Sequence, residues 1–504
     1  MPALRKRVLV ANRGEIALRV VRTCRVLGLT SIAAHSEADA SLPFVREADE
    51  AAVLGPGPAR DSYLAIGRVV EAARNARADL LHPGYGFLSE NPDLAESVEA
   101  AGIVFVGPRA ETLRRMGNKV TAKEAAEKAG VPVNPGTGKL RDALHAAGEG
   151  ARIGWPALLK AAAGGGGRGM RVVESPRDLE AAFRTASAEA LASFGKADLF
   201  LEGLVRPARH VEVQVFGDGE GRAAALGERE CSVQRRHQKV LEEAPSPAVD
   251  AGLRARLCAA AAALAQEAKY RGAGTVEFLL DAEGRFRFLE MNCRLQVEHP
   301  VTEAVLGTDL VAAQLRLALG GGMPEFPPAE PRGWAVESRV CAEDPEAEFA
   351  PSTGRILALE VPRGPWVRWD GGYAAGDAVG PHYDSLIGKL ICWGATRAEA
   401  IDRSVAALGR LAVLGPRTNA EFLRAVLDHP RFREGRLSTS FLDEEFPPPW
   451  RAPERDDGDR AIAAAAAWLA LGGAAGNGGA AAAEANPTPW ASLPGWRGHG
   501  GGGA

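Results

Sequence analysis

The stretch Phe286-Arg-Phe-Leu-Glu-Met-Asn-Cys-Arg-Leu-Gln-Val-Glu-His-Pro-Val-Thr-Glu303 decides the fold that we expect for this chain of 504 residues. It follows a second β-rich run, Gly274-Thr-Val-Glu-Phe-Leu-Leu280, and the turn Asp281-Ala-Glu-Gly284 lies between them. Two such runs around a short turn that contains glycine predict a β-hairpin. If Asp281 pairs with Gly284, Glu277 lies opposite Phe288. Because side chains alternate across a strand, one face should then carry Thr275, Glu277, Phe288, Glu290 and Asn292.

Two carboxylates and an amide on one face indicate a cation site. At a separation of ~4 Å, two like charges repel by roughly 1 kcal/mol in water and ~4 kcal/mol at a protein surface. A hard dication with oxygen ligands removes this cost, and Mg²⁺ held by one or two carboxylates and substrate phosphates fits. A solvated face with two unrelated acids is the alternative. The segment just beyond the strand favours a site, because it crowds together Arg294, Gln296, Glu298 and His299.

The run from Glu290 to Glu303 closely resembles the signature of the biotin carboxylases, which belong to the ATP-grasp superfamily. The resemblance extends from about Val8 to about Glu445. It implies an α/β fold, α+β in the lid and C-terminal parts. The expected domains are a Rossmann-like N-terminal domain at 1–115, an ATP-grasp domain at 116–330 with a mobile glycine-loop lid at about 134–205, a C-terminal mixed-sheet domain at 331–447, and a Pro/Ala/Gly-rich linker and tail at 448–504.

The composition narrows the function independently of this resemblance. The 64 acidic and 60 basic residues nearly cancel, which argues against a nucleic-acid or anionic-membrane partner. The six cysteines form no C-x-x-C pair, and no secretory signal or apolar run of 18 residues is present. We therefore expect a cytoplasmic protein without a nucleic-acid or membrane partner.

The first hundred residues predict a parallel sheet. An apolar strand over 7–11, a helical repeat over 16–27 and a second strand over 30–35 follow one another. The segment lacks G-x-G-x-x-G, which argues against a dinucleotide site. The loop His82-Pro-Gly-Tyr-Gly-Phe-Leu-Ser-Glu-Asn91 follows a further strand, and ligands of open α/β sheets bind beyond such strand ends. In the family that this chain resembles, the loop borders the active site.

A glycine-rich loop, Ala163-Gly-Gly-Gly-Gly-Arg-Gly-Met170, joins a strand over 155–161 to one over 171–173. Glycine lets backbone N–H groups approach a phosphate closely, although the run could instead be a flexible hairpin tip. The resemblance makes it the ATP lid. The nucleotide-binding residues that the resemblance implies are Lys119, Lys160, Gly166, Gly167, Glu202, Gly203, Leu204, Val205, His210, His237, Glu277 and Glu290.

The resemblance also implies the reaction. ATP, held with Mg²⁺ or Mn²⁺, phosphorylates bicarbonate to carboxyphosphate, and biotin on a carrier protein is then carboxylated. Glu298 is the expected base, Arg294 the expected bidentate partner of bicarbonate, and Arg339 the group that stabilises the biotin enolate. The expected metal ligands are Glu277, Glu290 and Asn292. The expected bicarbonate site comprises Lys239, Arg294, Gln296, Val297 and Glu298.

No methionine of the chain precedes a lysine, so it carries no Ala-Met-Lys-Met biotinylation site. We therefore expect the biotin carboxyl carrier protein and the carboxyltransferase on separate chains, as in an acetyl-CoA or related acyl-CoA carboxylase of fatty acid biosynthesis. The resemblance further implies a homodimer. Two alternatives stay open: another ATP-grasp ligase with a different acceptor, and a non-catalytic scaffold of the same fold.

Overall fold

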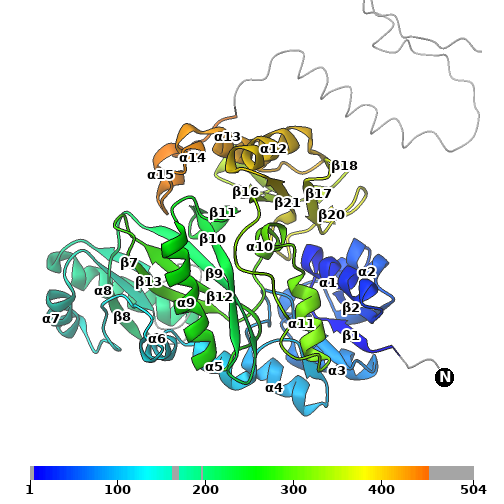
Figure 1. The fold of residues 1–504 in the computed structure, drawn as a ribbon, viewed down its shortest axis with the longest axis horizontal. Coiled ribbons are helices and arrows are strands. Elements are labelled where there is room, and N and C mark those ends of the chain that lie inside the picture. Colours follow the sequence, from blue (N-terminus) through cyan, green and yellow to red (C-terminus); the bar gives the residue numbers. More distant parts are fainter. Residues whose placement is uncertain (1–4, 162–169, 195–196, 453–504) are drawn as a thin grey trace, which may run out of the picture. The chain divides into compact units, whose positions relative to one another are not determined.

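A five-stranded parallel sheet, in the order β3-β2-β1-β4-β5, starts the chain and confirms the expected strand–helix–strand beginning (Figure 1). The computed structural model describes residues 5–161, 170–194 and 197–452. The strands of this sheet are β1 Arg7–Val10, β2 Thr30–Ser36, β3 Glu50–Gly55, β4 Leu80–His82 and β5 Val104–Phe105. The helices among and after them are α1 Gly14–Val26, η1 Glu37–Asp39, α2 Pro43–Glu47, η2 Ala59–Asp61, α3 Ile66–Asn75, α4 Pro92–Ala100 and α5 Ala110–Gly117.

An eight-stranded sheet forms the centre of the fold, in the order β13-β12-β9-β10-β11-β14-β21-β19. Its strands are β9 Arg209–Asp218, β10 Ala223–Arg235, β11 Gln238–Ala244, β12 Arg271–Leu280, β13 Phe286–Asn292, β14 Trp334–Cys341, β19 Val367–Gly371 and β21 Leu386–Gly394. The associated helices are α9 Ala251–Glu267, α10 His299–Leu306 and α11 Leu310–Ala318. Because β11 pairs with β14, the expected domain boundary at residue 331 falls between strands of one continuous sheet.

A small sheet of three strands, in the order β7-β6-β8, covers the region where we expect the lid. Its strands are β6 Ala157–Ala161, β7 Met170–Val173 and β8 Leu199–Gly203, and its neighbouring helices are α6 Lys119–Lys128, α7 Ala143–Ile153, η3 Pro176–Asp178 and α8 Leu179–Phe194. The glycine loop joins β6 to β7, as expected, but residues 162–169 lie outside the described residues. The expected phosphate contacts of Gly166 and Gly167 are therefore not described.

The C-terminal part differs from the expectation at one strand. The segment Arg355-Ile-Leu-Ala-Leu-Glu360 predicts a single strand, but two short strands form there and pair with different partners. Ile356 is buried between them, whereas Leu357 is 45% exposed. The strands are β15 Glu343–Asp344, β16 Ala350–Pro351, β17 Gly354–Arg355, β18 Ala358–Glu360, β20 Ala378–Val379 and β22 Ala412–Leu414, and the helices are η4 Pro345–Ala347, α12 Arg397–Arg410, α13 Ala420–Asp428, α14 Pro430–Arg433 and α15 Phe441–Glu445.

The hairpin of β12 and β13 forms, but its expected register is wrong. Glu277 pairs with Glu290 rather than with Phe288, and Thr275 pairs with Asn292. The ladder is interrupted between Glu277 and Phe278, and beyond this bulge Phe278 pairs with Phe288. The difference amounts to two residues: one arises at the turn, where Leu280 pairs with Phe286 rather than with Arg285, and one at the bulge, and alternation reveals neither. Glu277, Glu290, Thr275 and Asn292 still share a face, whereas Phe288 pairs into the apolar core.

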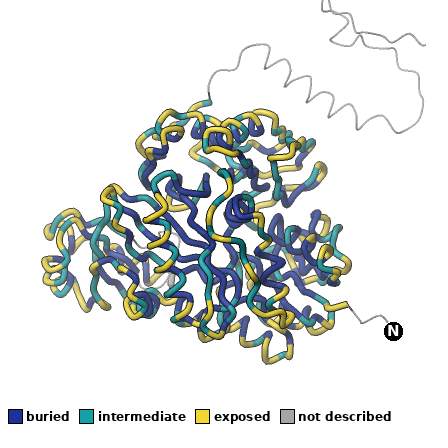
Figure 2. The backbone as a smooth tube through the Cα atoms, viewed as in Figure 1, coloured by how far each residue is buried: buried dark blue, intermediate teal, exposed yellow. Residues whose placement is uncertain are grey.

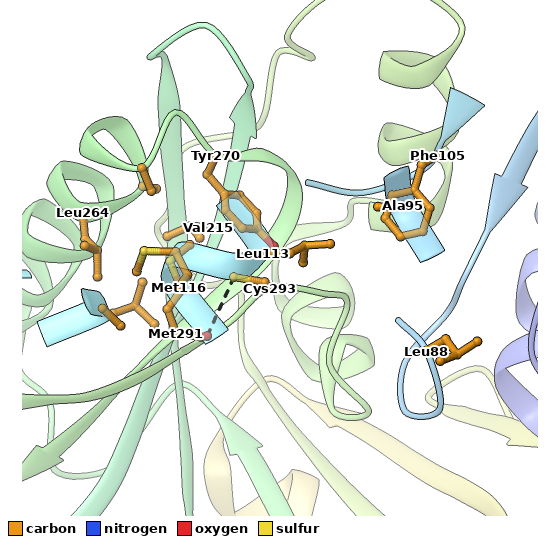
Figure 3. Close-up of a cluster of buried hydrophobic side chains, with 14 of the residues drawn as sticks. Leu88, Ala95, Phe105, Leu113, Met116, Val215, Leu264, Tyr270, Met291 and Cys293 are labelled. Atoms are coloured by element: carbon orange, nitrogen blue, oxygen red, sulfur yellow. Dashed lines mark hydrogen bonds between the residues drawn. The ribbon is translucent and has the colours of Figure 1, made fainter. Parts of the chain in front are cut away.

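That core supports the hairpin from behind (Figures 2 and 3). Figure 3 shows Met116, Tyr270, Met291 and Cys293 gathered from helices and strands that are distant in sequence. The Tyr270 hydroxyl donates to the carbonyl of Ala273 at 3.0 Å. A Cβ atom added to Gly274 would lie 2.5 Å from the Tyr270 ring, so only glycine lets β12 lie this close to it.

The described residues up to 452 belong to one compact unit, and residues 453–504 lie outside the described residues. The ring of Trp450 packs edge-on against Phe422, with centroids 5.4 Å apart. The guanidinium of Arg451 donates to the carbonyl of Glu346 at 2.7 Å. None of the described helices is long and apolar enough to cross a membrane.

These contacts predict different outcomes for two truncations. A chain that ends at Pro453 should keep the melting temperature of the full chain, because it retains Trp450 and Arg451. A chain that ends at Pro449 should melt about 2 °C lower, because loss of the packed Trp450 ring costs roughly 2 kcal/mol and about 1 kcal/mol shifts Tm by roughly 1 °C in a chain of this size. Thermal unfolding of both would test this. Equal melting temperatures would show that Trp450 contributes nothing to the main body.

Candidate active site

The paired carboxylates of β12 and β13 have different surroundings. Lys239 Nζ lies 2.9 Å from Glu277 Oε1, and His210 Nε2 lies 3.0 Å from Glu277 Oε2. The amide of Asn292 donates to Glu277 Oε1 at 2.7 Å. Burial opposes ionisation of Glu277, but Lys239 and His210 hold its pKa well below the usual range. Glu277 is therefore a fixed negative charge.

In the described chain, Glu290 forms no ion pair of the kind that Glu277 forms with Lys239 and His210. Among the described residues its carboxylate accepts no side-chain hydrogen bond, and burial and the charge of Glu277 raise its pKa, while Lys119 opposes the rise. Two carboxylates on directly opposed strand positions have Cβ atoms about 4.5–5.5 Å apart. The oxygen atoms of Glu277, Glu290 and Asn292 are the hard donors that Mg²⁺ prefers, so these residues fit the ion.

Two other groups of side chains could bind a metal ion, but the ammonium of Lys239 lies among them. His210, Glu212 and Glu277 converge, as do Glu212, Cys231 and Glu298. Lys239 Nζ donates to Glu212, to Glu277 at 2.9 Å and to Glu298 at 2.6 Å. Its ammonium thus contacts carboxylates of both groups, whereas Glu290 forms no such close ion pair among the described residues.

A cavity of about 140 Å³ lies in front of these carboxylates. Lys160 Nζ donates to Glu202 Oε2 at 2.5 Å, and burial lowers the pKa of Lys119, which Glu290 counteracts. Most of the expected nucleotide residues of the described chain line this cavity, namely Lys119, Lys160, Glu202, His210, His237, Glu277 and Glu290. Phosphate groups would find both lysines and the carboxylate pair within one space.

The other expected nucleotide residues lie at the end of β8. Gly203 is its last residue, and its N–H donates to the carbonyl of Pro135 at 2.9 Å. Leu204 N–H donates to the carbonyl of Pro156 at 3.3 Å, and Val205 follows. Leu204 and Val205 are not among the residues that line the cavity beside Glu290.

The turn between β10 and β11 carries His237 in a strained conformation. Arg236 and His237 have φ values of 50° and 63°, in the left-handed region that favours glycine. Such residues cost of order 1–3 kcal/mol each and cluster at functional sites. His210, the other expected histidine, is held through Nδ1, 2.6 Å from the amide nitrogen of Gln234. Both histidines line the cavity.

Arg294 lies at the centre of a second polar cluster. Its guanidinium donates to Gln296 Oε1 at 2.7 Å and to Asn292 Oδ1 at 3.0 Å. Glu90 accepts from Arg294 Nε at 3.0 Å and from the N–H of Cys293 at 2.8 Å. Sequence reasoning did not single out Glu90, although it placed the loop 82–91 at a ligand site. Glu90 orients Arg294 from the N-terminal sheet.

Glu298 is held between two cations. Lys239 Nζ donates to its Oε1 at 2.6 Å, and Arg339 Nη2 donates to its Oε2 at 2.9 Å. Its side chain is fully buried, and although burial opposes ionisation, Lys239 and Arg339 hold its pKa well below the usual range. Arg339, which the resemblance assigns to the biotin enolate, also contacts the candidate base directly.

Three buried charges behind this cluster were missed by sequence reasoning. Arg229 donates to Glu212 at 2.5 Å and to Thr302 at 2.9 Å, and its side chain is fully buried. Glu242 accepts from Arg339 Nε at 2.6 Å. The alternation of valines along β9 was a usable signal for Glu212, because it places the intervening residues on the opposite, polar face.

The titration of Glu242 gives a testable pH dependence. Burial raises the pKa of the Glu242 carboxyl to about 7, and Arg339 opposes the rise. Unfolded glutamate titrates near ~4.3, so the folded chain binds this proton more tightly and loses stability as pH rises between the two values. The free energy of unfolding of Glu242→Gln, relative to the parent, should be roughly 2–3 kcal/mol higher at pH 8 than at pH 5. Urea titrations at both pH values measure it, and an unchanged difference would refute the shift.

Comparison with known proteins agrees with this geometry. Three family models match: the biotin carboxylase N-terminal domain over residues 4–113, the ATP-binding domain of the carbamoyl-phosphate synthase L chain over 118–326, and the biotin carboxylase C-terminal domain over 337–444. The biotin carboxylase of a Nostoc species is 47% identical over 440 residues, which cover 87% of this chain and 98% of that protein. The chain belongs to the biotin carboxylases.

Solved structures of other biotin carboxylases share the fold. The biotin carboxylase domain dimer of 2-oxoglutarate carboxylase from Hydrogenobacter thermophilus, in complex with MgADP, ADP and bicarbonate, is 42% identical with a TM-score of 0.84, over 87% of this chain and 97% of that one. The enzyme from Campylobacter jejuni is 41% identical with the same TM-score, over 87% and 99% of the two chains. The expected ATP-grasp fold and ligase class are thereby confirmed for this biotin carboxylase.

Proposed function

We propose that this biotin carboxylase activates bicarbonate with ATP and Mg²⁺ and then carboxylates biotin on a separate carrier chain. The observation that carries the proposal is the position of Glu298, fully buried between Lys239 and Arg339. A carboxylate in that position can take a proton from bicarbonate while two cations fix its geometry. The bicarbonate in the related Hydrogenobacter thermophilus structure supports the same substrate here.

The bicarbonate site is completed by groups around Glu298. The guanidinium of Arg294 offers a planar fork that matches bicarbonate, and Gln296 and Glu90 orient it. Lys239 would supply a second cation, and the backbone of Val297 would complete the pocket. Arg339 would stabilise the negative charge of the biotin enolate. In this assignment Arg294, Glu298 and Arg339 are the catalytic residues.

The nucleotide assignment follows the cavity. Lys119 and Lys160 would bind phosphates, and His210 and His237 would line the same space. Glu277, Glu290 and Asn292 would hold Mg²⁺, which when bound supplies positive charge between the transferring phosphates. The segment from Glu202 to Val205 is assigned to the adenine, and the lid roles of Gly166 and Gly167 stay predictions.

The deciding experiment measures phosphate release and carboxybiotin in one reaction. ATP cleavage should require bicarbonate, and free biotin should become carboxylated. Cleavage with an amino acid or another carboxylate in place of biotin would favour a different ATP-grasp ligase. A folded chain that binds ATP without cleaving it under any condition would favour the scaffold alternative.

Replacement of Glu290 by glutamine should strongly lower turnover and raise the Mg²⁺ requirement. The reason is the loss of the one carboxylate of the pair that forms no close ion pair within the described chain, where only the more distant charges of Lys119 and His210 act on it. Removing a metal ligand should lower the maximal rate by about 10²-fold, within the range of charge stabilisation at phosphoryl groups. The control is Glu283→Gln, an exposed residue in the turn of the same hairpin. An unchanged Mg²⁺ titration in Glu290→Gln would remove the metal role.

The partners and setting extend this proposal. A carrier protein and a carboxyltransferase on separate chains would complete an acyl-CoA carboxylase, with the chain itself a cytoplasmic homodimer. The propionyl-CoA carboxylase alpha chain of Ruegeria pomeroyi is 43% identical over 484 residues, covering 92% of this chain and 71% of that one. Acetyl-CoA, with a role in fatty acid biosynthesis, and propionyl-CoA are therefore both acceptors to assay. Co-purification from the native cell would identify the partners.

The domain organisation also stays a proposal. We assign 1–115 to the N-terminal domain, 116–330 to the ATP-grasp domain with its lid at about 134–205, 331–447 to the C-terminal domain and 448–504 to the linker and tail. The matched family models, which end at residues 113, 326 and 444, support this division. Limited proteolysis should cut first after residue 453 and within the lid.

A further inference from the structure

Lys389 is a buried cation that the roles assigned above do not use. Its side chain has no exposed surface, and the β14–β21 register places it directly opposite Arg339. Its ammonium donates to the main-chain carbonyl of Val297 at 2.7 Å and lies 3.1 Å from Glu15 Oε1. One side chain of β21 thus joins helix α1 of the N-terminal sheet to the loop that precedes Glu298.

The surroundings of Lys389 keep it charged. Burial alone lowers the pKa of an ammonium, yet here Glu15, Glu337 and Asp370 outweigh it and raise the pKa of Lys389, with Arg368 opposing them. An unpaired buried ammonium would cost several kcal/mol, so this lysine is tolerated only because carboxylates surround it. A charged donor makes a stronger hydrogen bond to the Val297 carbonyl than a neutral one.

The Val297 carbonyl belongs to the peptide unit that begins Glu298. A peptide unit is planar, so the direction of the Val297 C=O fixes the N–H and Cα of the next residue. Glu298 also stands at the N-cap of α10 without a side-chain capping bond, which leaves its carboxylate free for Lys239 and Arg339. The orientation of this peptide therefore sets where the Glu298 side chain begins, and Lys239 and Arg339 hold its carboxylate.

We propose that Lys389 is a positioning residue for Glu298, acting through the Val297 carbonyl, with Glu15 as the counter-ion that holds the ammonium in place. The proposal rests on the proposed role of Glu298 in activating bicarbonate. A misplacement of about 1 Å at a reacting group costs on the order of 10²-fold in rate. Lys389 touches neither nucleotide nor bicarbonate in this account, so its loss should affect bicarbonate use and spare ATP binding.

The test uses Lys389→Met, which keeps the length of the side chain and removes its charge and donor. We expect kcat/KM for bicarbonate to fall by about 30- to 100-fold, in line with that misplacement, and KM for ATP to stay within about 2-fold. Lys389→Arg keeps the positive charge and the hydrogen-bond donors. It should restore at least about one third of the lost log(kcat/KM) for bicarbonate. In Lys389→Met, amide hydrogen exchange should become faster in the segment 293–298 but not in the central strands.

The outcomes separate this inference from the proposed function. A parent enzyme without bicarbonate-dependent ATP cleavage would defeat the proposed function. An active parent whose Lys389→Met variant loses ATP and bicarbonate use in equal proportion, with unchanged exchange at 293–298, would defeat the positioning role. If Lys389→Met does not fold, Glu15→Gln decides: it keeps an acceptor but no charge, and it should raise KM for bicarbonate several-fold, whereas unchanged kinetics would overturn the proposal.

Discussion

Glu298→Gln should reduce bicarbonate-dependent ATP cleavage by about 10³-fold, within the 10²–10⁴ that a positioned general base contributes. The amide keeps the volume of the side chain but cannot take a proton. Lys239 retains Glu212 and Glu277 as partners, so the cluster should not collapse. Phosphate release with saturating bicarbonate and biotin measures the effect. ATP affinity, measured by equilibrium binding, should change little because Glu298 does not line the nucleotide cavity.

The matched control is Glu243→Gln. Glu243 is the neighbour of Glu242 on β11, is equally buried and accepts from Arg397 at 2.7 Å, but it lies on the opposite face of the strand. Its loss breaks a buried ion pair without touching the site. Glu298→Gln should therefore be far less active than Glu243→Gln at similar or greater stability. A Glu298→Gln enzyme within 10-fold of the parent would assign the proton to another acceptor.

Sequence reasoning located this site because its residues are close along the chain. Period-two alternation placed Glu277 and Glu290 on one face, and this prediction held because the observed register differs from the predicted one by two residues; a shift by one residue would have separated them. Alternation did not predict that Glu277 pairs directly with Glu290, because the alternating pattern of the sequence does not show the bulge beyond Glu277. The strand expected over 355–360 failed for a related reason: its two halves pair with different strands, which only the tertiary fold determines.

The buried charges that surround the site could not be found in the same way. Glu90, Glu242 and Lys389 come from three elements, and each reads alone as an ordinary polar residue of a loop or strand. Their importance follows from convergence on Arg294, Arg339 and the peptide before Glu298. Motif resemblance named the residues that we propose touch substrate, whereas the residues that contact and orient them required the structure.

Because Arg339 contacts Glu298, its loss should affect bicarbonate activation as well as carboxyl transfer. Arg339 is one of two cations on Glu298 and is also the partner of Glu242. Without it, the pKa of Glu298 should rise, because Arg339 is one of the groups that lower it. A higher pKa makes Glu298 a better proton acceptor, which partly offsets the poorer orientation of its carboxylate. Bicarbonate activation should therefore survive in part.

Carboxyl transfer should not survive, since Arg339→Ala also removes the cation proposed to stabilise the biotin enolate. We expect carboxybiotin formation to fall by about 10²–10³-fold, as for the loss of an oxyanion-stabilising group, and bicarbonate-dependent phosphate release to fall only about 10-fold. The acid limb of the pH profile for phosphate release should move upward, because Glu298 then titrates at higher pH. Arg397→Ala, which breaks the pair with Glu243 on the other face of β11, controls for lost stability. Equal losses of phosphate release and carboxybiotin in Arg339→Ala would show that Arg339 serves Glu298 alone.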